Sequence, residues 1–115
     1  MDLLPVLRGS TKNHDVTARI YAMIENIDQN VGRLFRAIEA IGIIQNTIVI
    51  FMVDNGPNGI RYTGGFRGRK TDVYEGGSRS PFFMHWPGRL KAGGFSDALA
   101  AHIDVMPTLL DAAGI

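Results

Sequence analysis

TIVIFMVDNGP, at residues 47–57, is the stretch that decides the expected fold of this 115-residue chain. Residues 47–53 form a continuous apolar run rich in β-branched side chains. Such a run is typical of a central strand that is covered on both faces. It stops abruptly at Asp54-Asn55-Gly56-Pro57, four residues that favour a tight turn. We therefore expect a buried strand followed directly by a turn.

A long amphipathic helix is expected upstream of this strand. Apolar residues recur at three- and four-residue spacing from Ile20 to Ile41, and polar residues occupy the opposite face. Asn13 or Asp15 is expected to cap the start of the helix, and Gly42 is placed to end it. Residues 1–13 are accordingly expected to be irregular.

A second strand and a short helix are expected downstream. The segment PFFMHW at residues 81–86 predicts a strand whose aromatic side chains lie in the core. A final helix is expected from Asp104, as its cap, through Ala113. The order helix, strand, long loop, strand, helix is typical of an α/β sheet with helical layers. Because this sheet is too small to stand alone, we interpret residues 1–115 as a single partial domain.

Composition excludes several classes of protein and site. A hydrophobic content of 45% with 20% charged residues argues against disorder, and the absence of cysteine excludes disulfides and thiolate metal sites within this chain. No apolar run reaches the roughly 18 residues that a membrane-spanning helix needs, so no membrane span is expected. The first twelve residues lack a signal-peptide pattern, and the compartment cannot be read from the sequence. A net charge of +1 gives no overall support for a nucleic-acid partner.

Asp54 and Asn55 are the candidate metal ligands. They follow the carboxyl end of the predicted strand, where open α/β sheets bind ligands. A carboxylate beside an amide carbonyl offers two hard oxygen ligands, suited to Ca²⁺ or Mg²⁺. The same residues are also common turn formers, so a plain turn is the alternative. The histidines lack metal-ligand spacing, and His85 and His102 are expected to pack.

The glycine-rich loop that follows is the candidate anion-binding segment. It has a net charge of +3, from five basic and two acidic side chains: Arg61, Arg67, Arg69, Lys70, Arg79, Asp72 and Glu75. Beside a carboxylate-bound cation, such a loop would complement a compact anion such as sulfate or phosphate. A solvated basic loop without a ligand is the equally weighted alternative. Interleaved aromatic residues give only a weak RNA-binding pattern.

Several short segments match one family pattern in a fixed order from Tyr21 to the end of the chain. They are YAMIENID (21–28), NTIVIF (46–51), DNGP (54–57), Arg67-Gly68 with Lys70, YEGG (74–77), WPG (86–88), Ile103-Asp104, PTLL (107–110) and Ala113-Gly114. Each segment alone is weak, but the ordered series is specific. The chain resembles the sulfatase family, arylsulfatase-like members of the alkaline-phosphatase superfamily.

This resemblance implies a fold, a reaction and a site. The chain would be the C-terminal part of a sulfatase catalytic domain, with part of an alkaline-phosphatase-like sheet taken from a larger α/β/α sandwich. Asp54 and Asn55 would be two ligands of a divalent cation, usually calcium. Lys70 would contact an oxygen of the sulfate ester substrate and stabilise charge as the ester bond breaks. Arg67, in the same motif, is a second candidate for substrate binding.

The sequence also departs from the family pattern. It contains no Cys/Ser-x-Pro-x-Arg motif for the formylglycine nucleophile, and it lacks the upstream aspartate pair, lysine and histidine. We expect these in a missing N-terminal part, so the chain alone is expected to be inactive. Thr71 stands where the family usually has glycine.

Two other interpretations stay open. A phosphate or phosphonate ester hydrolase of the same superfamily would use a similar cation and lysine. Alternatively, the chain is a non-catalytic fragment that binds an anion or a partner through residues 61–79. An open sheet face would also favour self-association of the isolated chain.

Overall fold

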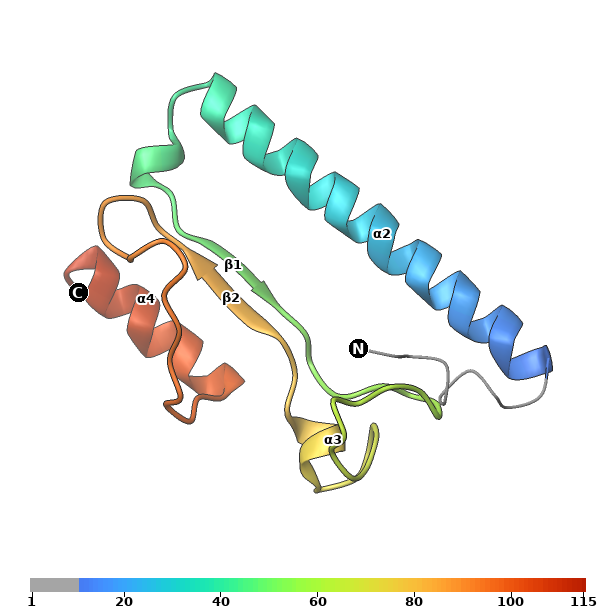
Figure 1. The fold of residues 1–115 in the computed structure, drawn as a ribbon. Helices are drawn as coiled ribbons and strands as arrows, with labels where there is room; N and C mark the ends of the chain where they lie inside the picture. Colours follow the sequence, from blue (N-terminus) through green and yellow to red (C-terminus); the bar gives the residue numbers. More distant parts are fainter. Residues whose placement is uncertain (1–10) are drawn as a thin grey trace.

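The computed structural model describes the backbone of residues 11–115 and the side chains from Asp15 onward. The elements follow one another along the chain as helix, strand, short helix, strand and helix, with two 3-10 turns between them (Figure 1). They are α2 (Thr11–Ala40), η1 (Ile44–Asn46), β1 (Val49–Met52), α3 (Glu75–Ser78), β2 (Phe82–His85), η2 (His102–Asp104) and α4 (Val105–Ala113). This mixture of helices and strands confirms the α/β class.

The long helix ends where the sequence predicts but begins earlier. Gly42 adopts a left-handed φ of 74°. Its N–H donates to the Glu39 carbonyl at 2.9 Å, and the Ile43 N–H donates to the Ile38 carbonyl at 3.1 Å. These two bonds form the Schellman arrangement that terminates many helices.

The start of α2 corrects the expected cap. The helix begins at Thr11, so Asn13 and Asp15 lie inside it and neither can be its cap. Residues 11–13 are therefore helical rather than irregular, while residues 1–10 lie outside the described part. Asn and Asp cost at most about 0.7 kcal/mol in a helix interior, so the long apolar pattern overrides their preference for caps.

The two strands pair with each other in antiparallel register. Val49 pairs with His85, and Phe51 pairs with Phe83, whose rings lie 6.3 Å apart. Both strands lie within the predicted segments but are shorter. Within residues 11–115, β1 has β2 as its one neighbour, and its residues are only half-buried. Within residues 11–115 the expectation of a central strand covered on both faces is therefore wrong, because β1 has a partner on one edge alone and its faces are left half-open.

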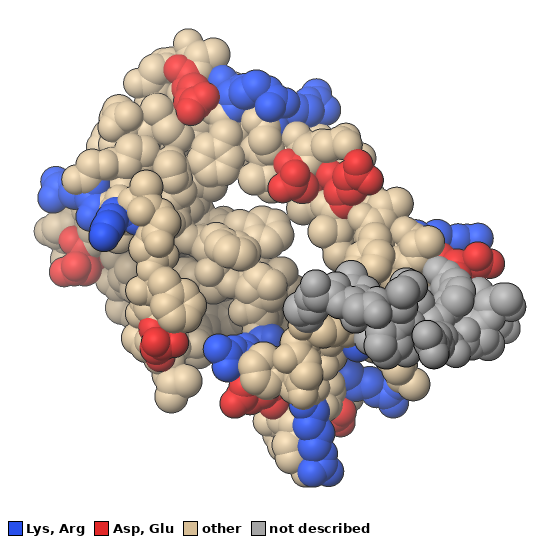
Figure 2. Space-filling view, viewed as in Figure 1, with Lys and Arg blue, Asp and Glu red and all other residues tan. Residues whose placement is uncertain are grey.

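Helices lie on both sides of the strand pair. Figure 1 shows α2 along one side and α4 along the other. The Phe35 ring of α2 meets the His85 ring of β2 edge-on at 5.1 Å, although His85 itself is exposed. Figure 2 shows an opening between α2 and the rest of the molecule. The helix and the sheet therefore meet only locally.

The apolar surfaces of these elements remain exposed. Among the side chains described, no hydrophobic residue is fully buried. Met23 of α2 is 63% exposed, and Phe83 of β2 is 65% exposed, so the expected aromatic core at residues 81–86 does not form within this chain. No helix in the described part is both long and apolar enough to span a membrane.

The last helix begins where the sequence predicts, but the side chain of its cap residue bonds elsewhere. Asp104 precedes α4, but its carboxylate accepts a hydrogen bond from the Ala101 N–H at 2.6 Å. Asp104 thus holds the expected N-cap position of α4, but its carboxylate caps the preceding η2 turn. At the other end, Gly114 has a φ of 76° and repeats the Schellman arrangement seen at Gly42.

Two glycines of the α2 region should respond oppositely to alanine. Gly42→Ala forces a left-handed alanine with no new contact within 4 Å, so it should destabilise the helix by about 1 kcal/mol. Gly32→Ala places its Cβ 3.5 Å from the flexible tip of Arg36 and should stabilise α2 by about 1 kcal/mol. Urea denaturation followed by far-ultraviolet circular dichroism measures both effects. Equal signs for the two variants would contradict the assignment of Gly42 as the helix terminator.

Candidate functional site

Three buried glycines hold the long loop together. Gly56 follows the Asp54-Asn55 pair, and Gly76 and Gly77 lie in α3. The Gly56 N–H donates to the Gly77 carbonyl at 2.7 Å, and the Gly76 N–H donates to the Arg67 carbonyl at 2.7 Å. These bonds join three separate stretches of the loop through backbone atoms alone.

Side chains cannot be accommodated at these three positions. A Cβ on Gly56 would overlap the Gly76 carbonyl. A Cβ on Gly76 would overlap the Arg67 carbonyl, and one on Gly77 would overlap the Asp72 carbonyl. Because the overlapping atoms belong to the backbone, the loop itself would have to move. The crowded glycines of the sequence therefore mark a close backbone approach.

Lys70 lies in a tight turn that is fixed at both ends. The Asp72 N–H donates to the Arg69 carbonyl at 2.8 Å, and the Asp72 carboxylate accepts from the Arg69 N–H at 3.1 Å. Thr71 has a φ of 76°, the value required at the third position of a type II turn. The Lys70 N–H donates to the Pro57 carbonyl at 2.9 Å. This last bond ties the lysine turn to the turn that follows β1.

The Asp54-Asn55 pair begins where β1 pairing ends. Val53 still donates to the Pro81 carbonyl at 3.1 Å, and the Ser80 hydroxyl donates to the Val53 carbonyl. Asn55 is half-buried, and its amide nitrogen donates to the Gly56 carbonyl at 2.9 Å. That bond uses the nitrogen and leaves the amide oxygen as the available ligand atom. The Asp54 side chain is exposed.

The two oxygen donors fit part of a hard-cation site. Asp54 and Asn55 supply the carboxylate and amide oxygens that Ca²⁺ accepts, but Ca²⁺ takes six to eight oxygen ligands. Among the described residues, no group of three histidine, cysteine, aspartate or glutamate side chains is placed to hold a metal ion. The described residues therefore offer two candidate ligands, fewer than a complete Ca²⁺ site needs.

Two of the five basic side chains have structural partners. The Arg67 guanidinium lies 4.0 Å from the centre of the Tyr74 ring. Arg79 pairs with Glu75 at 3.0 Å and lies 4.8 Å from the centre of the Phe66 ring. These contacts brace the loop around α3. Arg67, predicted as a substrate-binding residue, is thus occupied by an aromatic contact.

The α3 turn is the element that the sequence did not predict. Its core is Gly76-Gly77, and glycine normally weakens a helix by about 1 kcal/mol. The Arg79–Glu75 pair, four residues apart, was the signal for a helical turn. Basic side chains gather around this end of the molecule in Figure 2.

Comparison with known proteins identifies the family. The model of the Sulfatase family matches residues 7–115. The chain belongs to the sulfatase family. Sulfatases are part of the alkaline-phosphatase superfamily and typically use a divalent cation.

Relatives at 36% to 41% identity support this membership of the sulfatase family. The chain is 41% identical over 93 residues to the arylsulfatase A of Homo sapiens, covering 76% of this chain and 18% of that protein. It is 38% identical over 98 residues to YdeN, an uncharacterized sulfatase of Escherichia coli (strain K12), covering 83% and 17%. It is 36% identical over 98 residues to the N-acetylgalactosamine-6-sulfatase of Mus musculus, covering 80% and 19%.

This sulfatase sequence spans less than a fifth of the length of these relatives. No solved structure matches it significantly. The family, rather than a particular activity, is what these matches establish.

The glycine contacts predict a sharp response to single methyl groups. Gly77→Ala must displace the Arg69 and Asp72 carbonyls and should lower the free energy of local opening by about 1–3 kcal/mol. The Lys70 amide should then exchange with solvent roughly tenfold faster or more, as measured by hydrogen exchange. Gly59→Ala is the matched control, because its Cβ would meet only the flexible tip of Arg61 at 3.5 Å. Equal exchange in both variants would refute the backbone junction.

Replacing Thr71 with glycine should stabilise the lysine turn. A left-handed backbone conformation destabilises a residue with a Cβ by roughly 1–2 kcal/mol, and glycine avoids this strain. The greater entropy of glycine in the unfolded chain offsets roughly 0.5–1 kcal/mol of that gain. Thr71→Gly should therefore slow exchange of the Asp72 amide by about two- to fivefold. Thr71→Ala keeps the strained φ and should not slow exchange. Faster exchange in Thr71→Gly would show that the threonine side chain supports the turn.

Proposed function

We propose that this chain is the C-terminal part of a sulfatase catalytic domain and that the intact protein hydrolyses a sulfate ester. In this proposal Asp54 and Asn55 supply two oxygen ligands to a divalent cation, with Ca²⁺ as the best fit. Lys70 contacts a sulfate oxygen. The observation that carries the proposal is the bond from the Lys70 N–H to the Pro57 carbonyl at 2.9 Å, which joins the lysine turn to the Asp54-Asn55 turn.

The chemistry of Lys70 follows from its charge and surroundings. As the S–O ester bond breaks, negative charge increases on the sulfuryl oxygens, and a fixed ammonium group stabilises that charge. The Lys70 side chain is exposed, and no ion pair joins it to an acidic side chain in the described part of the chain. Its positive charge is therefore available to an anionic ligand. A bound cation would supply further electrostatic stabilisation of the sulfate group.

Exposed apolar surface supports the proposal of a larger domain. Met23, Ile24 and Leu34 of α2 are each at least half exposed, and β1 lacks a second neighbouring strand in the described residues. In an alkaline-phosphatase-like α/β/α sandwich, further strands and helices would cover these surfaces. In this proposal, an N-terminal part of the catalytic domain would carry the formylglycine nucleophile and the remaining cation ligands.

The names of the relatives favour sulfate over phosphate as the substrate group. Arylsulfatase A and N-acetylgalactosamine-6-sulfatase are named for sulfate esters. A tetrahedral phosphate or phosphonate ester has a similar shape and charge, so the geometry of Asp54, Asn55 and Lys70 does not separate the two. Relative rates do.

Turnover of an aryl sulfate by the full-length protein tests the function. Lys70→Ala should lower kcat by about 10²- to 10³-fold, the usual loss when one stabiliser of a developing oxyanion is removed. Lys91→Ala is the matched control, because Lys91 is also an exposed lysine but lies beyond β2. Unchanged turnover in Lys70→Ala would refute the role of Lys70.

The matching aryl phosphate, assayed on the same protein, separates the ester classes. Faster hydrolysis of the phosphate than of the sulfate would replace the sulfatase proposal with the phosphoesterase alternative. Hydrolysis of neither ester would favour a non-catalytic, anion-binding chain.

A further inference from the structure

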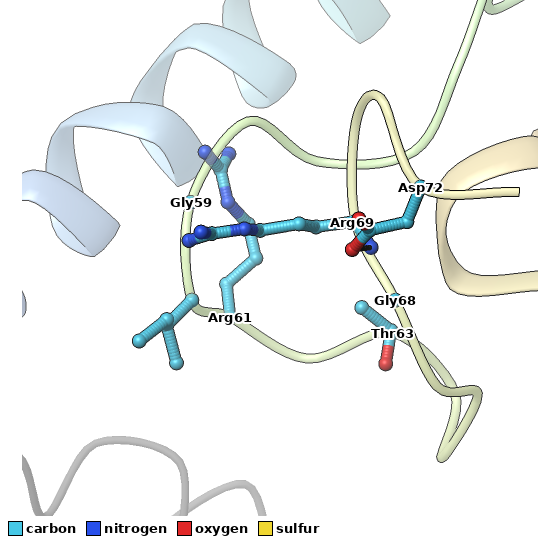
Figure 3. A pocket seen from close by; sticks show the side chains of 7 residues that line it. Gly59, Arg61, Thr63, Gly68, Arg69 and Asp72 are labelled. Carbon is cyan, nitrogen blue, oxygen red and sulfur yellow. Dashed lines mark hydrogen bonds between the residues drawn. The ribbon is translucent and has the colours of Figure 1, made fainter. Parts of the chain in front are cut away.

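The long loop forms an open pocket beside the lysine turn, lined by both apolar and charged groups. Its volume is about 350 Å³, within the range of small-ligand sites. Arg61, Thr63, Arg69 and Asp72 line it (Figure 3). Arg69 immediately precedes Lys70, so the pocket and the proposed sulfate-binding lysine share one turn.

Two guanidinium groups come together in this pocket. Figure 3 shows the Arg69 side chain extending across the pocket toward that of Arg61, with both guanidinium groups near Gly59. The two groups come from segments eight positions apart, which the loop folds back on each other. Because both positively charged groups line the same pocket, an anion bound there would be attracted to both of them.

Neither guanidinium is neutralised within the part of the chain described. No ion pair or hydrogen bond joins the side chain of Arg61 or Arg69 to another described residue. Asp72 is the acidic residue of the pocket, but its carboxylate accepts from the Arg69 backbone N–H at 3.1 Å and lies outside ion-pair distance of both guanidinium groups. The lining side chains therefore carry a net positive charge.

The other arginines of the loop differ in this respect. Arg67 lies on the Tyr74 ring, and Arg79 is bound to Glu75 and lies on the Phe66 ring. Those two side chains brace the loop. Arg61 and Arg69 make no such contact and are left to bind a ligand.

We propose that Arg61 and Arg69 bind a second anionic group of the substrate, a carboxylate or another sulfate. This inference rests on the proposed function and extends it, since the substrate would then carry two anionic groups. Guanidinium groups present paired N–H donors that match the oxygens of carboxylate and sulfate. Lys70 would bind the reacting sulfate, and the arginine pair would bind the second group and orient the molecule.

Isothermal titration calorimetry with uncleavable ligands tests the pocket on the full-length protein. Benzenesulfonate carries one anionic group, whereas para-sulfobenzoate and meta-sulfobenzoate add a carboxylate at two different distances. At least one sulfobenzoate should bind roughly three- to tenfold more tightly than benzenesulfonate, the gain expected for partly exposed ion pairs. The double variant Arg61→Ala/Arg69→Ala should lose this preference.

Two further variants make the result specific. Arg33→Ala/Arg36→Ala removes the same two positive charges from exposed positions on α2 and should keep the preference. Lys70→Ala should weaken the binding of all three ligands to a similar extent. Unchanged affinities in Lys70→Ala would contradict the proposed function and would leave the inference about the pocket to the arginine variants. A preference that survives in the double variant, or no binding of either sulfobenzoate to the unchanged protein, would overturn the inference.

Discussion

Close packing of Gly56 against Gly76 and Gly77 is the constraint on which the rest of the site depends. The Gly56 N–H bonds to the Gly77 carbonyl at 2.7 Å, and a Cβ at any of the three glycines would overlap a backbone carbonyl. This contact brings the end of β1 against α3, and α3 in turn against the lysine turn. The turn that carries Lys70 and the turn that follows Asp54-Asn55 meet through main-chain atoms, at the bond from the Lys70 N–H to the Pro57 carbonyl.

Such a junction suits a segment with so little hydrophobic core. No apolar side chain in the described part is fully buried, whereas all three junction glycines are. Short backbone hydrogen bonds and two cation–π contacts, Arg67 on Tyr74 and Arg79 on Phe66, hold the loop locally. The described helices and strands, by contrast, leave much of their apolar surface exposed. The loop geometry is thus determined more locally than the arrangement of the helices around the sheet.

The sequence predicted those features whose causes are local. Gly42 ended α2 as expected, because a left-handed residue after an apolar pattern is a local signal. The two strands fell within the expected segments for the same reason. The central position of β1 was not obtained, because it depends on a second neighbouring strand and β2 is the one partner of β1 within residues 11–115. The α3 turn was missed because Gly76-Gly77 opposes helix propensity and is held in place by contacts distant in sequence.

The site itself was only partly accessible from sequence. Asp54, Asn55 and Lys70 could be nominated by motif, but the bond from Lys70 to Pro57 that joins their turns could not. The sequence also did not show that the basic residues make different contacts. A count of charges does not distinguish Arg67, which lies on the Tyr74 ring, from Arg69, which lines a pocket. Only the folded loop distinguishes them.

A loop fixed through its backbone has one further consequence for binding. A side chain at any of the three junction glycines would overlap the loop backbone, and at Gly77 the overlap is with the Arg69 and Asp72 carbonyls on either side of Lys70. The side chains of Arg61 and Arg69, by contrast, take no part in the backbone bonds that hold the lysine turn. The position of the lysine and the chemistry of the adjacent pocket are therefore physically separable. Under the proposed roles, substitutions at residues 61 and 69 would change which second anionic group is bound, while the turn that carries Lys70 would stay the same.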